Sequence, residues 1–428
     1  MRFTLLLLFF HSLVVGQQKL SGYKAPSTLQ LEQEIFSQYP FIQFKENYFQ
    51  FFSSASPNWE HFYDDLSSMI AQKDRKLNFY HIGGSHIQAD IYTHDIRTFF
   101  QSNWPGLTGE RGLVFPFGLA KTNNPGNYNF SSPNKWIAHK SVNSRPDDVQ
   151  YGLSGAVIKC ADSLITIRFK HLRSSVRPPF DRIRIYHNTG VFPFELNFGD
   201  DEILIADIIQ ETKLGYSEFL FSDFIDSIDV QFVRTTPTKI PLEIYGFEFL
   251  NDLPGITYNS VGINGAGLYT FLANEHFVRD LKVHPPDFFA FSLGTNDGYR
   301  PYDKFDPQVY KRNLESMINL VLSVNPDCAI LLIVPNDCGI GGKPNRNTPR
   351  QREVIRELAE QYQIPVWDFY GIMGELGSAS TWRNNGLMQP DLVHFTSTGY
   401  HLKGKLFIDA FLKYLDQFRQ LQTEITNE

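Results

Sequence analysis

The chain has few cysteines, no strong excess of charge and no long apolar run beyond its first residues. It contains 428 residues, of which three are cysteine, and its net charge is -7. No stretch is rich in lysine and arginine, and a weakly acidic chain without one argues against nucleic acid as a partner. With 42% hydrophobic and 20% charged residues, the composition is that of an ordinary soluble globular protein.

The three cysteines are Cys160, Cys328 and Cys338. Because three is an odd number, at least one thiol has no partner within the chain. A bridge between Cys328 and Cys338 stays open, but free buried thiols are the simpler interpretation. Their spacing does not match a zinc site, so we expect no metal and no cofactor.

The first residues have the pattern of a secretory signal peptide. A basic start at Arg2 is followed by an apolar run over residues 3–10 and by Val14-Val15-Gly16. The run is too short to cross a bilayer, and no later segment has 18 consecutive apolar residues. We therefore predict that residues 1–16 are removed and that the mature protein is periplasmic or extracellular, without a membrane span.

Apolar strands alternate with amphipathic helices in two parts of the chain, which is typical of an α/β fold with a parallel sheet. The predicted strands cover residues 77–83, 288–293, 329–334 and 364–369. The predicted helices cover residues 59–72, 87–101 and 398–414, with two more opening at Asp306-Pro307 and Thr348-Pro349.

The middle of the chain has a different, two-residue period. Ile165, Ile167 and Phe169 alternate with polar neighbours, and turn signals such as Asn188-Thr189-Gly190 separate the runs. This pattern, over residues 151–250, is typical of an antiparallel sandwich or jelly roll. We predict a three-layer α/β domain of residues 17–112 and 253–428, interrupted by a β domain of residues 113–252.

Ser85 follows the first predicted strand directly and precedes a helix. Such a junction exposes a side chain at the carboxyl end of a parallel sheet, where open α/β folds bind ligands. A helix N-terminus there also favours developing negative charge. Taken alone, Ser85 is better explained as a helix N-cap.

Asp391 precedes His394 by three residues. A carboxylate at that spacing can orient the imidazole and leave its second nitrogen free as a base. An isolated Asp-x-x-His is more often a surface ion pair or a hydrogen-bonded core histidine.

Gly265 and Asn296 lie between these two segments. Glycine lets a backbone N–H approach a ligand closely, and an asparagine amide at a strand end can donate to an oxyanion. Each is ordinary turn sequence when taken separately.

In this order, Ser85, Gly265, Asn296 and Asp391-x-x-His394 resemble the four blocks of the SGNH (GDSL-type) hydrolases. The resemblance covers roughly residues 75–112 and 253–415. It implies a serine esterase in which Ser85 is the nucleophile, His394 the base and Asp391 its orienting partner. The backbone N–H groups of Ser85 and Gly265 and the Asn296 amide would form the oxyanion hole.

A narrower resemblance is to peptidoglycan O-acetylesterases, in which a β domain similar to a carbohydrate-binding module is inserted after the first block. It rests on the sequences at residues 81–90 and 260–266 and on the β insert. The implied partner is an acetylated glycan, peptidoglycan above all. In one departure, Gly84 stands where the family usually has aspartate.

Three alternatives stay open at this point. The first is an acetylesterase for another polysaccharide, and the second is a lipase-like enzyme with an apolar acyl groove. The third is a glycan-binding protein with a weak or inactive hydrolase part, to which Gly84 gives some weight. Trp136 and Tyr151 are candidate sugar platforms that are more often core, and His86 and Gln88 either touch substrate or shape the nucleophile turn.

Overall fold

A computed structural model gives the structure of the chain and describes residues 28–53, 56–143, 145–172, 178–190, 192–198 and 205–427. The predicted signal peptide, residues 1–16, lies outside the described residues. Within these ranges, no helix combines the length and the apolar character that crossing a membrane requires.

The central sheet has six strands in the order β1-β18-β15-β14-β2-β13. Five of them run parallel, and β1 pairs antiparallel with β18 at one edge. Their bounds are β1 (Phe49–Gln50), β2 (Lys76–Gly83), β13 (Gly255–Gly262), β14 (Phe288–Ser292), β15 (Ala329–Ile333) and β18 (Val366–Trp367).

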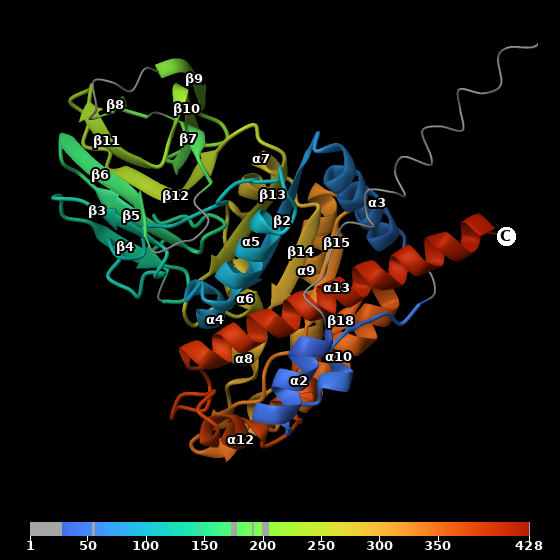
Figure 1. Ribbon diagram of the computed structural model, residues 1–428. Coiled ribbons are helices and arrows are strands. Elements are labelled where there is room, and N and C mark those ends of the chain that lie inside the picture. Colours follow the sequence, from blue (N-terminus) through green and yellow to red (C-terminus); the bar gives the residue numbers. More distant parts are fainter. Residues whose placement is uncertain are drawn as a thin grey trace, which may run out of the picture.

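Helices cover both faces of this sheet, because its strands are apolar on both sides. In β2, Leu77 and Phe79 belong to one core cluster, whereas Tyr80 and Ile82 belong to the other. The first face packs against α3 (Pro57–Gln72), α5 (Tyr92–Ser102) and α13 (Ser397–Asn427) (Figure 1). The second packs against α6 (Leu268–Leu272), α7 (Phe277–Val283), α9 (Pro307–Val324) and α10 (Asn347–Tyr362).

Most predicted helices form where the sequence places them, but the one expected over residues 87–101 is broken. The chain forms α4 (Ser85–Gln88), turns through Asp90 at φ 46°, and then begins α5. At the start of α9, the Asp306 carboxylate accepts the Gln308 N–H at 2.8 Å, as its N-cap pattern predicts. The last helix continues well past residue 414.

The remaining elements are short, apart from α2. They are α2 (Thr28–Gln38), η2 (Phe44–Glu46), α8 (Thr295–Gly298), η3 (Tyr302–Lys304), β16 (Gly339–Ile340), β17 (Lys343–Pro344), α11 (Phe369–Met373) and α12 (Ser378–Asn384).

The middle of the chain forms two antiparallel sheets, with orders β4-β5-β12-β7-β10-β9 and β3-β6-β11-β8 (Figure 1). Buried and exposed residues alternate along β6, as its two-residue period predicts. The strands are β3 (Tyr128–Ser131), β4 (Ile137–Lys140), β5 (Ala156–Cys160), β6 (Leu164–His171), β7 (Phe180–His187), β8 (Phe194–Phe198), β9 (Ile205–Glu211), β10 (Tyr216–Ile225), β11 (Ser227–Arg234) and β12 (Leu242–Leu250). The predicted fold class, a parallel α/β sheet interrupted by antiparallel β structure, is confirmed.

The chain passes between the two parts over residues 110–114. Glu110 still pairs with Thr257 beside the central sheet, whereas Val114 pairs with Phe247 of β12. One hydrophobic cluster includes both Ile82 of β2 and Phe247, so the β part packs against the central sheet.

The structure also settles two minor expectations. All three cysteines are buried and free, so there is no Cys328–Cys338 bridge. Trp136 is 8% exposed and Tyr151 is fully buried, so neither is a platform for sugar. Both aromatic rings belong to the core.

Candidate active site

The four sequence blocks meet at the carboxyl-terminal edge of the central sheet. Ser85 begins α4 just after β2, Gly265 follows β13, and Asn296 lies in α8 after β14. In Figure 1, α4 and α8 lie at the lower end of these strands. An open cavity of ≈ 400 Å³ is lined by Ser85, Ala89, Asn123, Asn264, Gly265, Asn296, Val393, His394 and Tyr400.

A chain of hydrogen bonds links Ser85, His394 and Asp391. The distance from Ser85 Oγ to His394 Nε2 is 2.8 Å, and that from His394 Nδ1 to Asp391 Oδ2 is 2.7 Å. The second carboxylate oxygen, Oδ1, accepts the backbone N–H groups of Val393 and His394 at 2.9 and 3.0 Å. Asp391 therefore fixes both the loop and the ring that it carries.

The charge of Asp391 is stabilised by these contacts. Burial raises the pKa of its carboxyl, but hydrogen bonds from the His394 ring and from the backbone N–H groups of His394 and Val393 outweigh burial and lower the pKa overall. A carboxylate that accepts from Nδ1–H leaves Nε2 of the neutral ring unprotonated and facing Ser85. This arrangement suits proton transfer from Ser85 to His394.

Three possible donors surround the space in front of Ser85. Ser85 is the first residue of α4, so its N–H has no carbonyl partner within the helix. The second donor is the N–H of Gly265. This residue has φ 85°, a left-handed conformation that favours glycine. One Asn296 amide hydrogen bonds the Ala266 carbonyl at 2.9 Å, which leaves the second available.

Gly84 leaves room for Asn296. A Cβ atom at residue 84 would lie 2.8 Å from Asn296 Nδ2 and 3.2 Å from the Ala266 carbonyl oxygen. Any side chain there, including the usual aspartate, would have to displace the amide. In this chain, glycine at position 84 and the position of Asn296 are therefore coupled.

His86 and Gln88 shape the site and are both buried. His86 Nδ1 is 2.9 Å from the Tyr400 hydroxyl, and burial holds the pKa of the imidazole well below its usual value. Gln88 Oε1 accepts the Asn264 N–H at 2.7 Å, and its Nε2 donates to the Asn123 carbonyl at 2.8 Å. These bonds hold the glycine loop beside the nucleophile.

Sequence reasoning missed a buried ion network that anchors the turn after Ser85. The Asp90 carboxylate accepts from Arg97 at 2.6 Å, from Arg111 at 2.9 Å and from Asn127 at 2.8 Å. Burial raises the pKa of Asp90, but Arg97 and Arg111 outweigh it and lower the pKa to about 2. No local spacing signals this network, because Arg111 and Asn127 come from the segment that leads into the β part.

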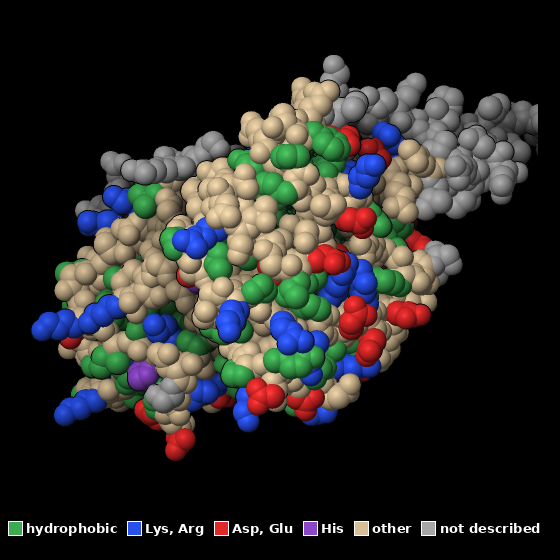
Figure 2. Space-filling view, turned by 90° about the horizontal axis from the view of Figure 1, so that it is seen from below, with side chains coloured by type: hydrophobic (Ala, Val, Ile, Leu, Met, Phe, Trp, Pro, Cys, Tyr) green, Lys and Arg blue, Asp and Glu red, His purple; other side chains and the backbone are tan. Residues whose placement is uncertain are grey.

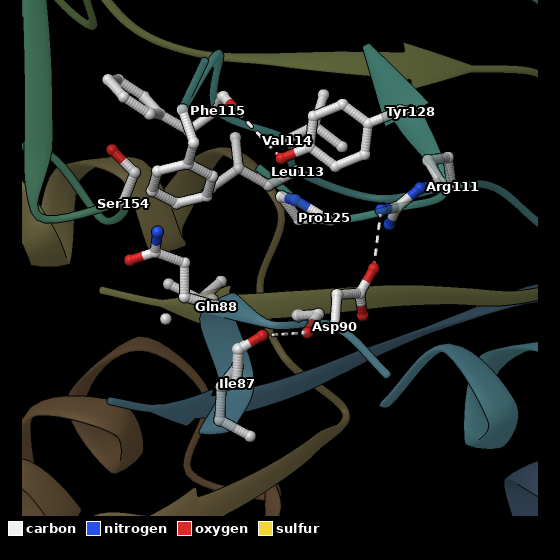
Figure 3. A pocket seen from close by; sticks show the side chains of 14 residues that line it. Ile87, Gln88, Asp90, Arg111, Leu113, Val114, Phe115, Pro125, Tyr128 and Ser154 are labelled. Carbon is white, nitrogen blue, oxygen red and sulfur yellow. Dashed lines mark hydrogen bonds and ion pairs between the residues drawn. The ribbon is translucent and has the colours of Figure 1, made fainter. Parts of the chain in front are cut away.

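Figure 3 shows where this network lies. Asp90 points to the Arg111 guanidinium beside a small internal cavity of ≈ 20 Å³, between the nucleophile helix and the first β strands. The ion pair with Arg111 ties the turn after Ser85 to the connecting segment, and the hydrogen bond from Asn127 ties it to the inserted part.

The surface at this end of the molecule has mixed charge. In the view from below, Lys and Arg side chains lie among Asp and Glu side chains, with uncharged surface between them (Figure 2). Among the described residues, no group of three His, Cys, Asp or Glu side chains is arranged to hold a metal ion.

Comparison with known proteins supports the same class. The GDSL-like Lipase/Acylhydrolase family matches residues 247–402, a span that includes Gly265, Asn296 and His394. Ser85 lies before this span in sequence, and the fold brings it to 2.8 Å from His394. The family match over residues 247–402 and the shared fold support a serine ester hydrolase of the SGNH type, and they confirm the predicted resemblance.

Among solved structures, a peptidoglycan O-acetylesterase is similar with a TM-score of 0.70 and 20% identity, over 86% of this chain and 99% of that one. Such coverage includes most of the inserted β part. A lipase/acylhydrolase from Enterococcus faecalis is 22% identical over 36% of this chain and 74% of that one, with a TM-score of 0.29. A GDSL-like lipase from Bacteroides thetaiotaomicron is 20% identical over 36% of this chain and 76% of that one, with a TM-score of 0.28. No curated protein matches the chain.

Proposed function

We propose that this protein is a secreted serine esterase that removes O-acetyl groups from a cell-wall glycan, with peptidoglycan as the first candidate. The observation that carries the proposal is the hydrogen-bonded chain Ser85–His394–Asp391 at the edge of an open cavity. Its residue types and distances are those of a nucleophile, a general base and an orienting carboxylate.

In the first half of the reaction, Ser85 Oγ attacks the acetyl carbonyl carbon while His394 Nε2 takes the hydroxyl proton. The tetrahedral intermediate then collapses, and His394 gives this proton to the departing sugar oxygen. The product is acetyl-Ser85 and a free sugar hydroxyl. In the second half, water attacks the acetyl carbonyl carbon while His394 takes its proton. The bond to Ser85 Oγ then breaks, His394 returns the proton to this oxygen, and the released acetic acid ionises to acetate.

The negative charge on the tetrahedral intermediate needs donors that are already in place. The N–H groups of Ser85 and Gly265 and the free Asn296 amide hydrogen converge on the same cavity and would supply them. The bond from Asn296 to Ala266 holds the amide before substrate arrives, so little reorganisation is required.

The choice of substrate rests on two arguments. A peptidoglycan O-acetylesterase shares the fold over the hydrolase and the inserted β part alike. The predicted signal peptide, residues 1–16, would deliver the mature protein to the compartment that contains peptidoglycan. The inserted β part would hold the glycan while the acetyl group reaches Ser85.

The test is release of acetate from O-acetylated peptidoglycan by residues 17–428, with Ser85→Ala as the matched control. We expect release by the wild-type protein and almost none by the variant, at unchanged thermal stability. Ser85-dependent release only from another acetylated polysaccharide would move the substrate and keep the chemistry. Preference for long acyl esters would favour a lipase-like enzyme, and no release from any ester would overturn the proposal.

A further inference from the structure

A second cavity, of ≈ 410 Å³, opens beside the candidate active site, and the proposed mechanism does not use it. Its walls come from α6, from the segment after α8 and from the start of α9. They consist of Tyr269, Asp297, Arg300, Lys304, Phe305, Asp306, Val309, Tyr310 and Asn313.

The two cavities share a wall. Asn296 lines the first and its neighbour Asp297 lines the second. Gly265 likewise lines the first cavity, and Tyr269, four residues further on in α6, lines the second. The Asp297 carboxylate accepts the Leu268 N–H at 3.0 Å and so joins the two sides of this wall. A polymer with one unit at Ser85 would thus have its next units within reach of the second cavity.

The floor of the second cavity is held rigidly by α10. Asn347 Nδ2 donates to the Gly298 carbonyl at 3.0 Å and to the Arg300 carbonyl at 2.8 Å. Arg350 donates to the Tyr302 carbonyl at 2.9 Å and lies over the Tyr302 ring at 4.6 Å. A preformed wall lowers the entropic cost of binding a ligand.

The lining combines an exposed aromatic ring with polar groups that suit sugar hydroxyls. Tyr269 is 50% exposed although it belongs to a helix that packs on α9. Arg300 is exposed beside Asp297, whose pKa burial raises to about 6 while the positive charge of Arg300 acts in the opposite direction. Asn313 and Asp306 add an amide and a carboxylate on the opposite wall, although Asp306 also caps α9.

We propose that this cavity is a glycan subsite that binds the sugar next to the acetylated one, with Tyr269 as stacking platform and Arg300 as polar anchor. The proposal rests on the proposed function, because it assigns a neighbouring unit of the same substrate. An apolar face of a pyranose ring covers the tyrosine ring, and its hydroxyls meet Arg300, Asp306 and Asn313. The esterase therefore gains specificity for a polymer over a free acetylated sugar.

The test compares kcat/KM for an O-acetylated peptidoglycan tetrasaccharide with kcat/KM for 4-nitrophenyl acetate, which has no second sugar. Tyr269→Ala should lower the ratio of the two values about three- to tenfold, the factor that one aromatic contact supplies. Arg300→Gln should lower it by a similar factor. Tyr299→Ala is the matched control, since Tyr299 is 45% exposed on the same surface but does not line the cavity, and it should leave the ratio unchanged.

A binding measurement separates this proposal from the esterase proposal. Titration of the Ser85→Ala protein with the non-acetylated tetrasaccharide should show weaker binding when Tyr269→Ala is added. If acetate release fails but this binding difference is found, the subsite stands and the esterase proposal falls. If release depends on Ser85 but neither the ratio nor the binding changes with Tyr269→Ala, the subsite is overturned.

Discussion

The two sides of the candidate active site are built differently. Ser85 lies on a turn whose anchor, Asp90, is 5% exposed and bonds groups 21 and 37 residues further along the chain. The side chains of His394 and Asp391 are 39% and 48% exposed, and Asp391 bonds groups two and three residues away, while one distant bond, from the Gly339 N–H to the Leu392 carbonyl at 2.9 Å, ties down the backbone of their loop. The nucleophile therefore depends on the packing of the whole fold, whereas the base depends mainly on its own loop.

Because of this difference, substitutions on one side should mainly lower activity, and substitutions on the other should mainly lower stability. A change on the base loop removes a functional group and little buried surface, because the loop is half-exposed. A change at the anchor of the nucleophile turn leaves buried charges without a partner. Substitutions on the two sides should accordingly affect different measurements.

The largest effect is expected for His394→Ala. Without the base, Ser85 keeps its proton, and kcat for an acetyl ester should fall by about 10⁴ or more. The melting temperature should change by less than about 2 °C, because the side chain is not in the core. A large fall in melting temperature together with the loss of activity would show that the loop is a structural element and would remove the contrast.

Asp90→Ala should have the largest effect on stability. It leaves Arg97 and Arg111 buried without their carboxylate, and the free energy of unfolding should fall by about 3–5 kcal/mol. Urea unfolding measures the change. Asp95→Ala is the control, since Asp95 pairs with the exposed His401 at 2.7 Å and should cost less than about 1 kcal/mol. Equal losses in the two variants would contradict the anchor role of Asp90.

The difference between the two sides also explains what could be predicted from the sequence. Asp391 and His394 are three residues apart, so their contact follows from local geometry, and the parallel strands place Ser85, Gly265 and Asn296 at one edge. The break between α4 and α5 was not predicted, because helical periodicity continues through it and the Asp90 turn depends on Arg111 and Asn127. Contacts between residues this far apart in sequence leave no local pattern in the sequence. The cavity beside Tyr269 could not be predicted for the same reason, because separate segments of the chain form its walls.

Asn296→Ala tests the side-chain donor of the proposed oxyanion hole. Loss of one oxyanion donor should lower kcat about 10²–10³-fold, with KM changed far less. Steady-state kinetics with an acetyl ester separate the two parameters. Asn264→Ala is the control, because this side chain also lines the cavity but bonds Asn123. A rise in KM at constant kcat would place Asn296 in substrate binding and not in the oxyanion hole.

The smallest effect is expected at Lys403, which packs behind the base loop. Its Nζ lies 4.4 Å from the Phe369 ring centre and 5.6 Å from that of Phe395, and burial lowers the pKa of the amine to about 7. Between pH 7 and 10.5 the Lys403 amine is protonated in the unfolded chain and increasingly neutral in the folded protein. Burial of Lys403 therefore lowers the free energy of unfolding most below pH 7, where both states carry the charge, and does not lower it above pH 10.5. Lys403→Met should therefore raise the free energy of unfolding by about 1–3 kcal/mol at pH 7, because the aromatic rings offset part of the cost.

This gain should shrink as the pH approaches 10.5, which thermal unfolding of both proteins across that range would measure. Lys405→Met is the control, since Lys405 is 52% exposed and pairs with Glu34, and it should not raise the free energy of unfolding at pH 7. A Lys403→Met protein that is less stable than wild type at pH 7 would mean that the contact between the ammonium and the rings outweighs burial. In that case the base loop, like the nucleophile turn, would depend on a buried charge, and the two sides of the site would be more alike than their exposure indicates.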